Sequence, residues 1–455
     1  MKPIVRELGV PPAVLRRLAA RLPARYPMLL DSAADGPLSR TSVLLAEPRA
    51  ALWLDQKGTL HAEGTVAQGD TFFGALEKWW LAERDPTPPG DLPFAGGWAI
   101  FLSYEMAQEV EPRLQLPPSS LPWRAFALRT PCALVHDRSQ ARVIAVAEAD
   151  SAELLDRLEA DAIRAAQESD ASDEVFRVKS ITEEDPDIHL ERVRRGKEYI
   201  AAGDIYQTNI SRPWHVELES DADVGALYNR LCTTNPAPFA ALAQWRGAAI
   251  VSSSPERLIR VEGRRVDTRP IAGTRPRSRL PENDIAEMTA LAAHPKERAE
   301  HIMLIDLERN DLGRVCEAGT VHVDELMTIE SYAHVHHIVS NVSGLLRPDV
   351  TPIEAVRAVF PGGTITGVPK FRCMQIIAEL EGVGRGAYTG SLGYLNRNGT
   401  MDLNILIRTM SVIGREILFR AGGGIVADSE PRRELGETRA KARGLLAAFE
   451  VAGEP

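Results

Sequence analysis

Short apolar runs alternate irregularly with stretches of helical periodicity along the 455-residue chain, and this mixture limits its possible folds more than any other feature. The runs 248–251 and 403–408 are short and aliphatic, as buried strands are. Residues 353–360 and 368–380 instead repeat apolar side chains at helical spacing. No repeat period or low-complexity tract appears. The sequence therefore predicts a mixed α and β fold.

The region before residue 175 has its own pattern. Strand-like runs such as 141–146 are followed by an acidic, alanine-rich stretch at 147–174 that has helical spacing. This stretch indicates a surface helix followed by a polar linker. We therefore expect an N-terminal region at 1–175 and a second region at 176–455.

Composition and charge exclude several classes of partner. The net charge is −10 and no block is rich in lysine or arginine, which argues against nucleic acid. No apolar run approaches the about 18 residues of a membrane span, and residues 1–23 lack the apolar core of a secretory signal. The four cysteines fit no metal-binding spacing and predict reduced core thiols. We expect a cytoplasmic protein without a nucleic-acid or membrane partner.

Two pairs of glutamates are spaced for one helix face. Glu297 and Glu300 follow Pro295, which suits a first helical position, and Glu434 and Glu437 are again three residues apart. Taken alone, either pair is a solvated helix face. If the two pairs converge, they form an oxygen-ligand site of the kind that Mg²⁺ prefers.

Two glycine-rich segments could bring backbone N–H groups close to an anion. The first, 421–426, lies between the strand-like run 416–419 and the acidic pair near residue 434. The second, 361–370, leads into a predicted helix at 371–380, whose N-terminus favours an anion. Neither matches a phosphate-binding or dinucleotide-binding fingerprint, and each alone is better explained as a tight turn.

Glu256 follows the apolar run 248–251 and a proline. A carboxylic acid at the end of a strand, beside a rigid turn, could donate a proton to a leaving hydroxyl. In isolation, a surface glutamate explains it better. The basic loop 269–277, a short way downstream, either attracts an anion or is plain surface.

In this order, these segments resemble the chorismate-utilising enzymes, which include anthranilate synthase component I, aminodeoxychorismate synthase component I, and the isochorismate and salicylate synthases. Residues 250–441 carry the resemblance through SSSPE, RPIAGTRPR, KERAEHIMLIDLERNDLGRV, SYAHVHHIVS, FPGGTITGVPK, GYLNRNGTMDLNILIRT and AGGGIVADSEPRRELGETRAK. MLLDSAADGPLSRTSVLLAEP and GGWAIFLSYEMAQ extend it over nearly the whole chain. The resemblance implies an α+β sandwich of two facing antiparallel β-sheets with helices outside, built from both regions of the chain.

The resemblance also implies a magnesium site. Glu300 and Glu437 correspond to the family's Mg²⁺ ligands, with Glu297 and Glu434 as close supports. The metal would bridge the protein to the ring carboxylate of chorismate. A dianionic substrate can enter a nest of glutamates only if the metal neutralises them.

Further residue roles follow from the resemblance. Glu256 matches the general acid that protonates the departing 4-hydroxyl, and His337 should lie near the ring. An arginine fork suits a carboxylate because it can bind both oxygens. The residues that would hold the two substrate carboxylates are Thr364, Tyr388, Arg408, Gly422, Gly423, Gly424 and Lys441.

The nucleophile is predicted from one position. Isochorismate and salicylate synthases activate water with a lysine where this chain has Gln207. An amide is not a general base at neutral pH, so the nucleophile should be ammonia. No glutaminase segment with a nucleophilic cysteine is visible, and the resemblance implies a separate glutamine amidotransferase subunit that supplies the ammonia.

Two ammonia-dependent reactions remain. The segments 206–209 and 361–367 resemble aminodeoxychorismate synthase, an enzyme of the transaminase class that replaces the C4 hydroxyl with an amino group for 4-aminobenzoate and folate synthesis. Ala272 instead matches anthranilate synthase, because well-known aminodeoxychorismate synthases carry at that position a lysine proposed to attack C2. We expect aminodeoxychorismate synthase component I. The alternative is anthranilate synthase component I, which aminates C2 and eliminates pyruvate for tryptophan synthesis.

Two further readings concern binding. A non-catalytic chorismate-binding subunit is disfavoured, because every candidate ligand and Glu256 are present. The stretch LLDSA at 29–33 resembles the tryptophan-binding element of the family, which makes tryptophan a candidate ligand of the N-terminal region.

Overall fold

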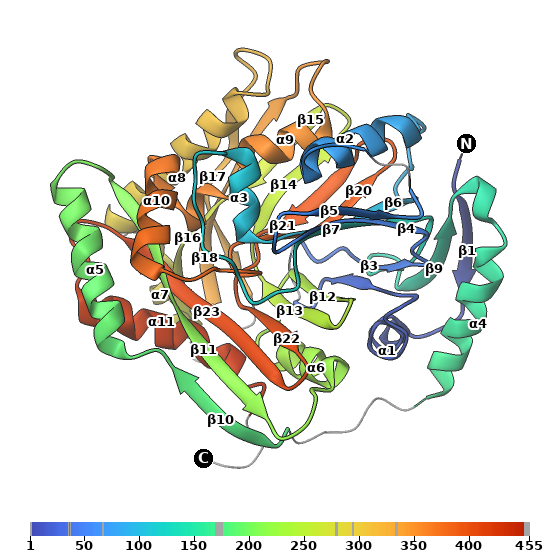
Figure 1. The fold of residues 1–455 in the computed structure, drawn as a ribbon, viewed down its shortest axis with the longest axis horizontal. Coiled ribbons are helices and arrows are strands. Elements are labelled where there is room, and N and C mark those ends of the chain that lie inside the picture. The colour runs from blue at the N-terminus through green and yellow to red at the C-terminus, as the bar shows by residue number, and fades with distance from the viewer. Residues whose placement is uncertain are drawn as a thin grey trace.

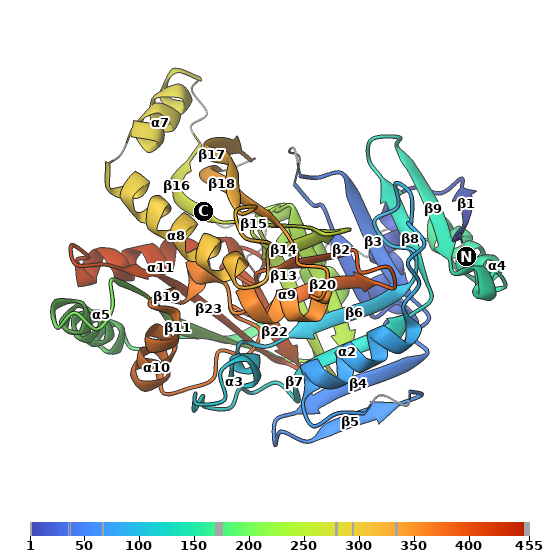
Figure 2. The ribbon, with the colours of Figure 1, turned by 90° about the horizontal axis from the view of Figure 1, so that it is seen from above.

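The computed structural model describes residues 2–34, 36, 38–65, 68–168, 176–277, 281–293, 295–332 and 335–449. In these ranges, two antiparallel sheets of twelve and eleven strands lie face to face, with helices along their outer sides (Figures 1 and 2). The expected fold class, an α+β sandwich of two facing antiparallel sheets, is confirmed.

The first sheet runs from one end of the molecule to the other. Its strand order is β1 (Ile4–Leu8), β9 (Arg142–Ala147), β8 (Cys132–Asp137), β3 (Thr41–Ala46), β2 (Met28–Asp31), β12 (Phe239–Trp245), β13 (Ala248–Ser254), β22 (Thr409–Ile413), β23 (Glu416–Ile425), β11 (Gln207–Leu218) and β10 (Val178–Glu183). The short strand β19 (Gly367–Val368) pairs with the start of β11.

The second sheet is built in the same way. Its order is β16 (Ile271–Pro276), β18 (Val335–Leu345), β15 (Arg265–Arg269), β14 (Arg257–Glu262), β21 (Met401–Asn404), β20 (Ser391–Asn396), β6 (Gly97–Leu102), β7 (Trp123–Thr130), β4 (Ala50–Asp55) and β5 (Leu60–Glu63). The strand β17 (His322–Ser331) pairs with β18 beside this path.

Helices cover the outer faces of both sheets. The first sheet packs against α1 (Ala13–Arg21), α4 (Leu154–Gln167), α6 (Val224–Thr234) and α11 (Pro431–Leu446). The second packs against α2 (Phe72–Glu83), α8 (Pro295–Gly313) and α9 (Pro352–Val359). The remaining helices are α3 (Ala107–Val110), α5 (Pro186–Ala201), α7 (Pro281–Ala293) and α10 (Lys370–Glu381). Figure 1 shows α5, α10 and α11 at one end of the molecule, and α1, α4 and the N-terminus at the other.

The central strands are buried on both faces. Along β3, Val43 and Leu45 point into the apolar layer between the sheets, whereas Leu44 and Ala46 pack under the outer helices. Successive side chains of a strand point to opposite faces, so both sets must be apolar. This is why the strand appears in the sequence as a continuous apolar run rather than as an alternating one.

Both regions of the chain contribute strands to each sheet. In the first sheet, β2 of the N-terminal region pairs with β12, and in the second sheet β6 pairs with β20. The expected boundary at residue 175 lies outside the described residues. Because of these pairings, the strands before and after the expected boundary share two hydrogen-bonded sheets and one apolar layer.

The chain passes from one sheet to the other several times, and two of these crossings lie next to each other. It leaves β13 at Ser254 and enters β14 at Arg257, and it leaves β21 at Asn404 and enters β22 at Thr409. The expected strand at 403–408 is therefore wrong beyond Asn404. The N–H of Ile405 bonds to the Glu256 carbonyl oxygen at 3.0 Å instead of extending the ladder, which turns the chain out of its sheet.

Other local expectations hold with small shifts. The helix at Pro295 begins as predicted, and the four cysteines are buried and free. The helix expected at 368–380 begins at Lys370, because Val368 still pairs with β11. Within the described ranges, no helix has the length and apolar character needed to cross a bilayer.

Cleavage between the two regions tests how they depend on each other. A protease site placed between Glu168 and Phe176 should give two fragments that co-elute and unfold in one transition. The physical reason is that separation would expose the β2–β12 and β6–β20 edges and the apolar layer. Size-exclusion chromatography and thermal unfolding of the cut protein measure this. Two fragments that elute separately and stay folded would contradict it.

Candidate active site

The glycine-rich run at 422–424 is part of a strand and not a turn. Gly422–Gly424 belong to β23 and pair with β11 across the sheet. A Cβ on Gly422 would lie 2.8 Å from the Tyr388 hydroxyl oxygen, and a Cβ on Gly424 would collide with the side-chain amide nitrogen of Gln207. Glycine therefore allows Tyr388 and Gln207 to lie directly against the backbone of this strand.

The carboxylates of α11 lie over the same strand. A Cβ on Gly423 would be 3.3 Å from the nearest oxygen of Glu437 and 3.5 Å from that of Glu434. The Lys441 ammonium donates to the Gly422 carbonyl oxygen at 2.8 Å and pairs with Glu437 at 2.7 Å. The expected residues of the glycine strand and of α11 are thus brought together in one place.

Glu256 occupies the first crossing between the sheets, where its side chain is 3% exposed. Its Oε1 accepts hydrogen bonds from the Thr364 hydroxyl at 2.8 Å and from the Ile271 N–H at 3.4 Å. Burial raises the pKa of Glu256 to about 7, because an apolar surrounding disfavours the charged form. Glu256 therefore holds a proton through the acidic range and about half of the time near pH 7, as suits a general acid.

Arg408 and His337 complete this side of the site. Arg408 lies at the second crossing with a φ of 51°, and no hydrogen bond or ion pair between its guanidinium and another described residue is formed. Burial lowers the pKa of Arg408, and it lowers that of His337 to about 3 with help from the charge of Arg408. His337 is therefore a neutral imidazole and Arg408 a cation free to bind an anion.

The carboxylates of α8 lie beside β16. A Cβ on Gly273 would be 3.0 Å from an oxygen of Glu297, and the φ of Gly273 is +70°. Glu297 and Glu300 are both half-buried on this helix. Ala272 precedes Gly273 and is also half-buried, opposite Ile338 of β18. Position 272 thus lies beside the glutamates, and its methyl group offers no nucleophile.

The four glutamates predicted as metal ligands come as two pairs from two helices. Glu297 and Glu300 come from α8, and Glu434 and Glu437 come from α11. Among the residues that the structure describes, no group of three or more histidine, cysteine, aspartate or glutamate side chains is arranged to hold a metal ion. The donors have the right chemistry for Mg²⁺, which takes oxygen ligands and often completes its shell with substrate. Their role as ligands stays a prediction.

A buried ion cluster supports the glycine strand, and sequence reasoning missed it. Glu381, at the end of α10, accepts from Arg385 at 2.7 Å, from Arg420 of β23 at 2.8 Å and from Ser211 of β11 at 2.9 Å. Burial alone would raise the pKa of Glu381, but the two arginines lower it to about 2. The i,i+4 spacing of Glu381 and Arg385 was the only signal, and it is common on helices.

A second buried group was also missed. Glu308 is 4% exposed on α8, and its Oε1 accepts the N–H of Gly363 at 3.3 Å. It follows Glu300 by eight residues, about two helical turns, so it shares that residue's face of the helix. That spacing could have revealed it.

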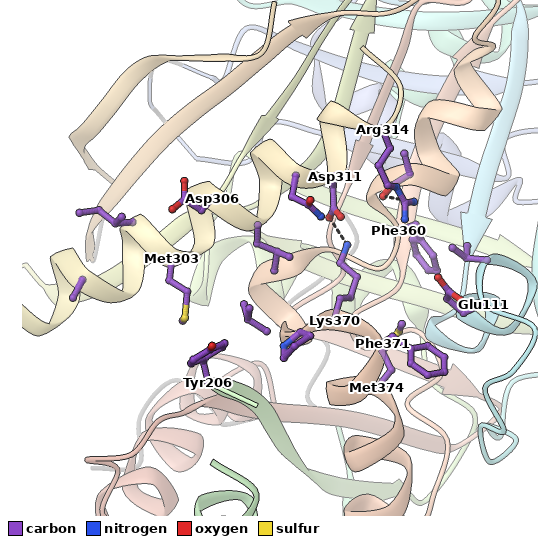
Figure 3. Close-up of a pocket in the computed structure, with 18 residues that line it drawn as sticks. Glu111, Tyr206, Met303, Asp306, Asp311, Arg314, Phe360, Lys370, Phe371 and Met374 are labelled. Atoms are coloured by element: carbon purple, nitrogen blue, oxygen red, sulfur yellow. Dashed lines mark hydrogen bonds and ion pairs between the residues drawn. The ribbon is translucent and has the colours of Figure 1, made fainter. Parts of the chain in front are cut away.

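A cavity of about 690 Å³ lies between α8 and α10, apart from the predicted site residues (Figure 3). Met303 of α8 and Met374 of α10 line it, and none of the residues predicted for the site does. The Lys370 ammonium in its wall contacts Asp311 at 2.5 Å and the carbonyl oxygens of two residues at 2.8 and 3.0 Å. All three N–H groups of this ammonium have partners within the protein, so none is left to bind an anionic substrate.

A buried acid, a buried arginine and several carboxylates are the groups expected of an enzyme for an anionic small molecule, and comparison with known proteins specifies the family. The sequence profile of the chorismate binding enzymes matches residues 27–447. The crystal structure of anthranilate synthase component I from Streptococcus pneumoniae TIGR4 has a TM-score of 0.79 and 30% identity, covering 89% of this chain and 92% of that one. The chain belongs to the chorismate-binding enzyme family.

Relatives with assigned names fall into two groups within this family. The chain is 42% identical over 442 residues to the anthranilate synthase component I-like protein of Synechocystis sp., covering 95% of this chain and 87% of that protein. It is 38% identical over 473 residues to anthranilate synthase component 1 of Thermus thermophilus, covering 99% and 97%. It is 35% identical over 479 residues to the aminodeoxychorismate synthase of Streptomyces griseus, covering 97% and 65%. The chain is thus a chorismate-utilising enzyme of the class that contains both.

Removal of the Glu381 carboxylate should destabilise the protein. Glu381→Gln leaves two buried guanidinium groups without their shared anion and should lower the free energy of unfolding by about 3 kcal/mol or more. Glu379→Gln on the same helix, whose ion pair is exposed, should cost less than about 1 kcal/mol. Urea unfolding of both variants makes the comparison. Equal midpoints for the two variants would show that the cluster is not a major support.

Proposed function

We propose that the chain is the chorismate-aminating component I of an aminodeoxychorismate synthase, which converts chorismate and ammonia to 4-amino-4-deoxychorismate for 4-aminobenzoate and folate synthesis. The observation that carries the ammonia chemistry is the environment of Gln207. The C4 position of amination is supported by the segments 206–209 and 361–367 and by the Streptomyces griseus relative, which matches 97% of the chain.

Gln207 can bind ammonia but cannot activate water. Its side chain is buried against Gly424, and among the described residues its Oε1 has no hydrogen-bond partner. A buried amide oxygen without a donor is costly, and an N–H group of ammonia would satisfy it. The amide has no basic lone pair with which to remove a proton from water at neutral pH. The position therefore favours amination over hydration.

Glu256 supplies the proton for the leaving group. Both hydrogen bonds to its carboxyl group, from Thr364 and Ile271, reach Oε1, which leaves Oε2 to carry the proton. As the C4–O bond breaks, this proton passes to the oxygen and the hydroxyl leaves as water. The nitrogen of ammonia forms the new C–N bond and releases a proton, so charge and atoms balance.

The substrate carboxylates would be held by groups on two sides of the site. Arg408 offers a planar fork without another described partner, and Tyr388 and Lys441 lie beside Gly422 of the glycine strand. His337, which is neutral, would lie against the ring without adding charge. These assignments rest on the proximity of Thr364 and Arg408 to Glu256 and on the chemistry of each group.

Magnesium fits the remaining donors. Glu300 and Glu437 would hold Mg²⁺, with Glu297 and Glu434 next to them on their helices. When bound, the ion would supply positive charge that offsets the glutamates and the ring carboxylate. The side chains of Glu437 and Lys441 are already paired at 2.7 Å, so the lysine would hold one ligand in position.

Ammonia would come from a separate glutamine amidotransferase subunit. All four cysteines of the chain are buried in apolar clusters, and burial raises the pKa of each thiol. A glutaminase nucleophile needs an accessible thiolate.

Tryptophan binding at residues 29–33 also stays a proposal. In that segment the Asp31 carboxylate accepts from Arg16, at 2.8 Å, and from Ser42, at 2.7 Å.

Anthranilate synthase component I is the second candidate, and one position favours it. Ala272 has no amine that could form a covalent adduct at C2, and the relatives from Synechocystis and Thermus thermophilus carry anthranilate synthase names. If the chain aminates C4, ammonia attacks there directly.

The product of turnover distinguishes the two candidates. Purified protein with chorismate, Mg²⁺ and ammonium should form a product that aminodeoxychorismate lyase converts to 4-aminobenzoate, with no pyruvate before the lyase is added. Chromatography and a coupled pyruvate assay measure both. Anthranilate with stoichiometric pyruvate, in the absence of lyase, would replace this proposal with the second candidate.

Neutralising a proposed metal ligand should abolish magnesium dependence. Glu437→Gln should reduce turnover by at least about a hundredfold, because a neutral amide is a poor ligand for Mg²⁺. Arg433→Gln, an exposed change on the same helix, serves as the control and should retain activity. Isothermal titration of both variants with Mg²⁺ and chorismate provides a readout besides turnover. Unchanged Mg²⁺ affinity in Glu437→Gln would remove this residue from the metal site.

A further inference from the structure

Glu308 lies behind the loop that positions the proposed acid. It comes from α8, and its Oε1 accepts the N–H of Gly363 at 3.3 Å. A Cβ on Gly363 would be 3.0 Å from this oxygen and 2.5 Å from a methyl carbon of Leu307, so only glycine lets the loop approach the helix. The next residue, Thr364, donates its hydroxyl proton to Glu256 at 2.8 Å. The adjacent residues Gly363 and Thr364 therefore connect the buried carboxyl groups of Glu308 and Glu256.

The charge of Glu308 has little compensation from its surroundings. The neighbouring ammonium of Lys370 pairs with Asp311 and with two carbonyl oxygens, and the Asp311 carboxylate adds negative charge beside Glu308. Burial, and then Asp311, raise the pKa of Glu308 to about 7. Lys370, the Gly363 N–H and Thr268 offset this effect only in part, so a carboxyl group this costly to bury needs an explanation beyond these contacts.

The charged groups facing Glu256 come from two elements. Glu308 on α8 raises the pKa of Glu256 in addition to the larger effect of burial, and Arg408 at the second crossing lowers it. Thr364 and the Ile271 N–H, which are neutral, occupy Oε1. An arginine beside a carboxyl group favours its ionised form, and the negative charge of Glu308 offsets this effect and adds to that of burial.

We propose that Glu308 is a positioning residue that anchors Gly363 and Thr364 against Glu256 and keeps Glu256 in its protonated form despite Arg408. The proposal rests on the proposed function, in which Glu256 donates a proton. Glu308 touches neither substrate nor reacting atoms. It acts through the loop and through its charge.

Two variants separate the anchor from the charge. Glu308→Gln keeps an acceptor for the Gly363 N–H and removes the charge, whereas Glu308→Met, a neutral side chain of similar length, removes both. Proton donation is complete below the pKa of Glu256 and is lost as pH rises through it. In both variants, therefore, the alkaline limb of kcat/KM should move down by about one pH unit, and turnover at about pH 8.5 should fall about tenfold. Glu308→Met should also lower kcat at every pH, because Thr364 is no longer held.

The control and a readout that needs no turnover complete the test. Asp306→Asn, an exposed change on the same helix, should leave the limb in place. In substrate-free protein with ¹³C-labelled glutamate carboxyl carbons, the signal that disappears in Glu256→Gln should titrate at lower pH in Glu308→Gln than in the parent protein. An unmoved Glu256 titration and an unmoved limb in Glu308→Gln would overturn the proposal. If the parent protein does not turn over chorismate, the proposed function fails, while the titration still decides the role of Glu308.

Discussion

A single backbone hydrogen bond, from the Ile405 N–H to the Glu256 carbonyl oxygen at 3.0 Å, joins the β13–β14 and β21–β22 crossings, two of the places where the chain passes between the sheets. Each crossing breaks a hydrogen-bonded ladder, so each exposes backbone groups that must find partners elsewhere. Because the two crossings satisfy one another, they lie side by side in the interior. The proposed acid Glu256 and the proposed anion-binding Arg408 come from these two crossings, and their proximity follows from this one constraint.

Three buried glutamates show how the surroundings set the charge state of one residue type. Glu381 lies between two arginines and has a pKa of about 2, so it is a permanent anion that fixes β23 and β11. Glu256 and Glu308 lack such an ion pair, and burial raises the pKa of each to about 7. The same side chain is a structural anion at position 381 and the proposed proton donor at position 256, because the compensating charge differs.

Some of the site could be predicted from sequence and some could not. The glutamate pairs of α8 and α11 have a helical spacing that is visible in the sequence, and both lie on helices as expected. The strand expected at 403–408 ends at Asn404, because hydrogen bonds to Glu256 and Gly390 from elsewhere in the chain replace its ladder. Glu381 was missed because its partner Arg420 lies 39 residues away on another strand. Local pattern contains no information about such partners.

The sequence by itself determined the family of the protein, its two-sheet α+β architecture and the residue types of its site, because these depend on local periodicity and on ordered motifs. Only the tertiary structure decided that the glycine run is a strand, that Gln207 faces it, and that Glu308 is buried behind Gly363. Burial, charge compensation and hydrogen-bond partners are properties of the whole packed chain. They arise when segments distant in sequence meet, and they set the pKa of Glu256 on which the proposed chemistry depends.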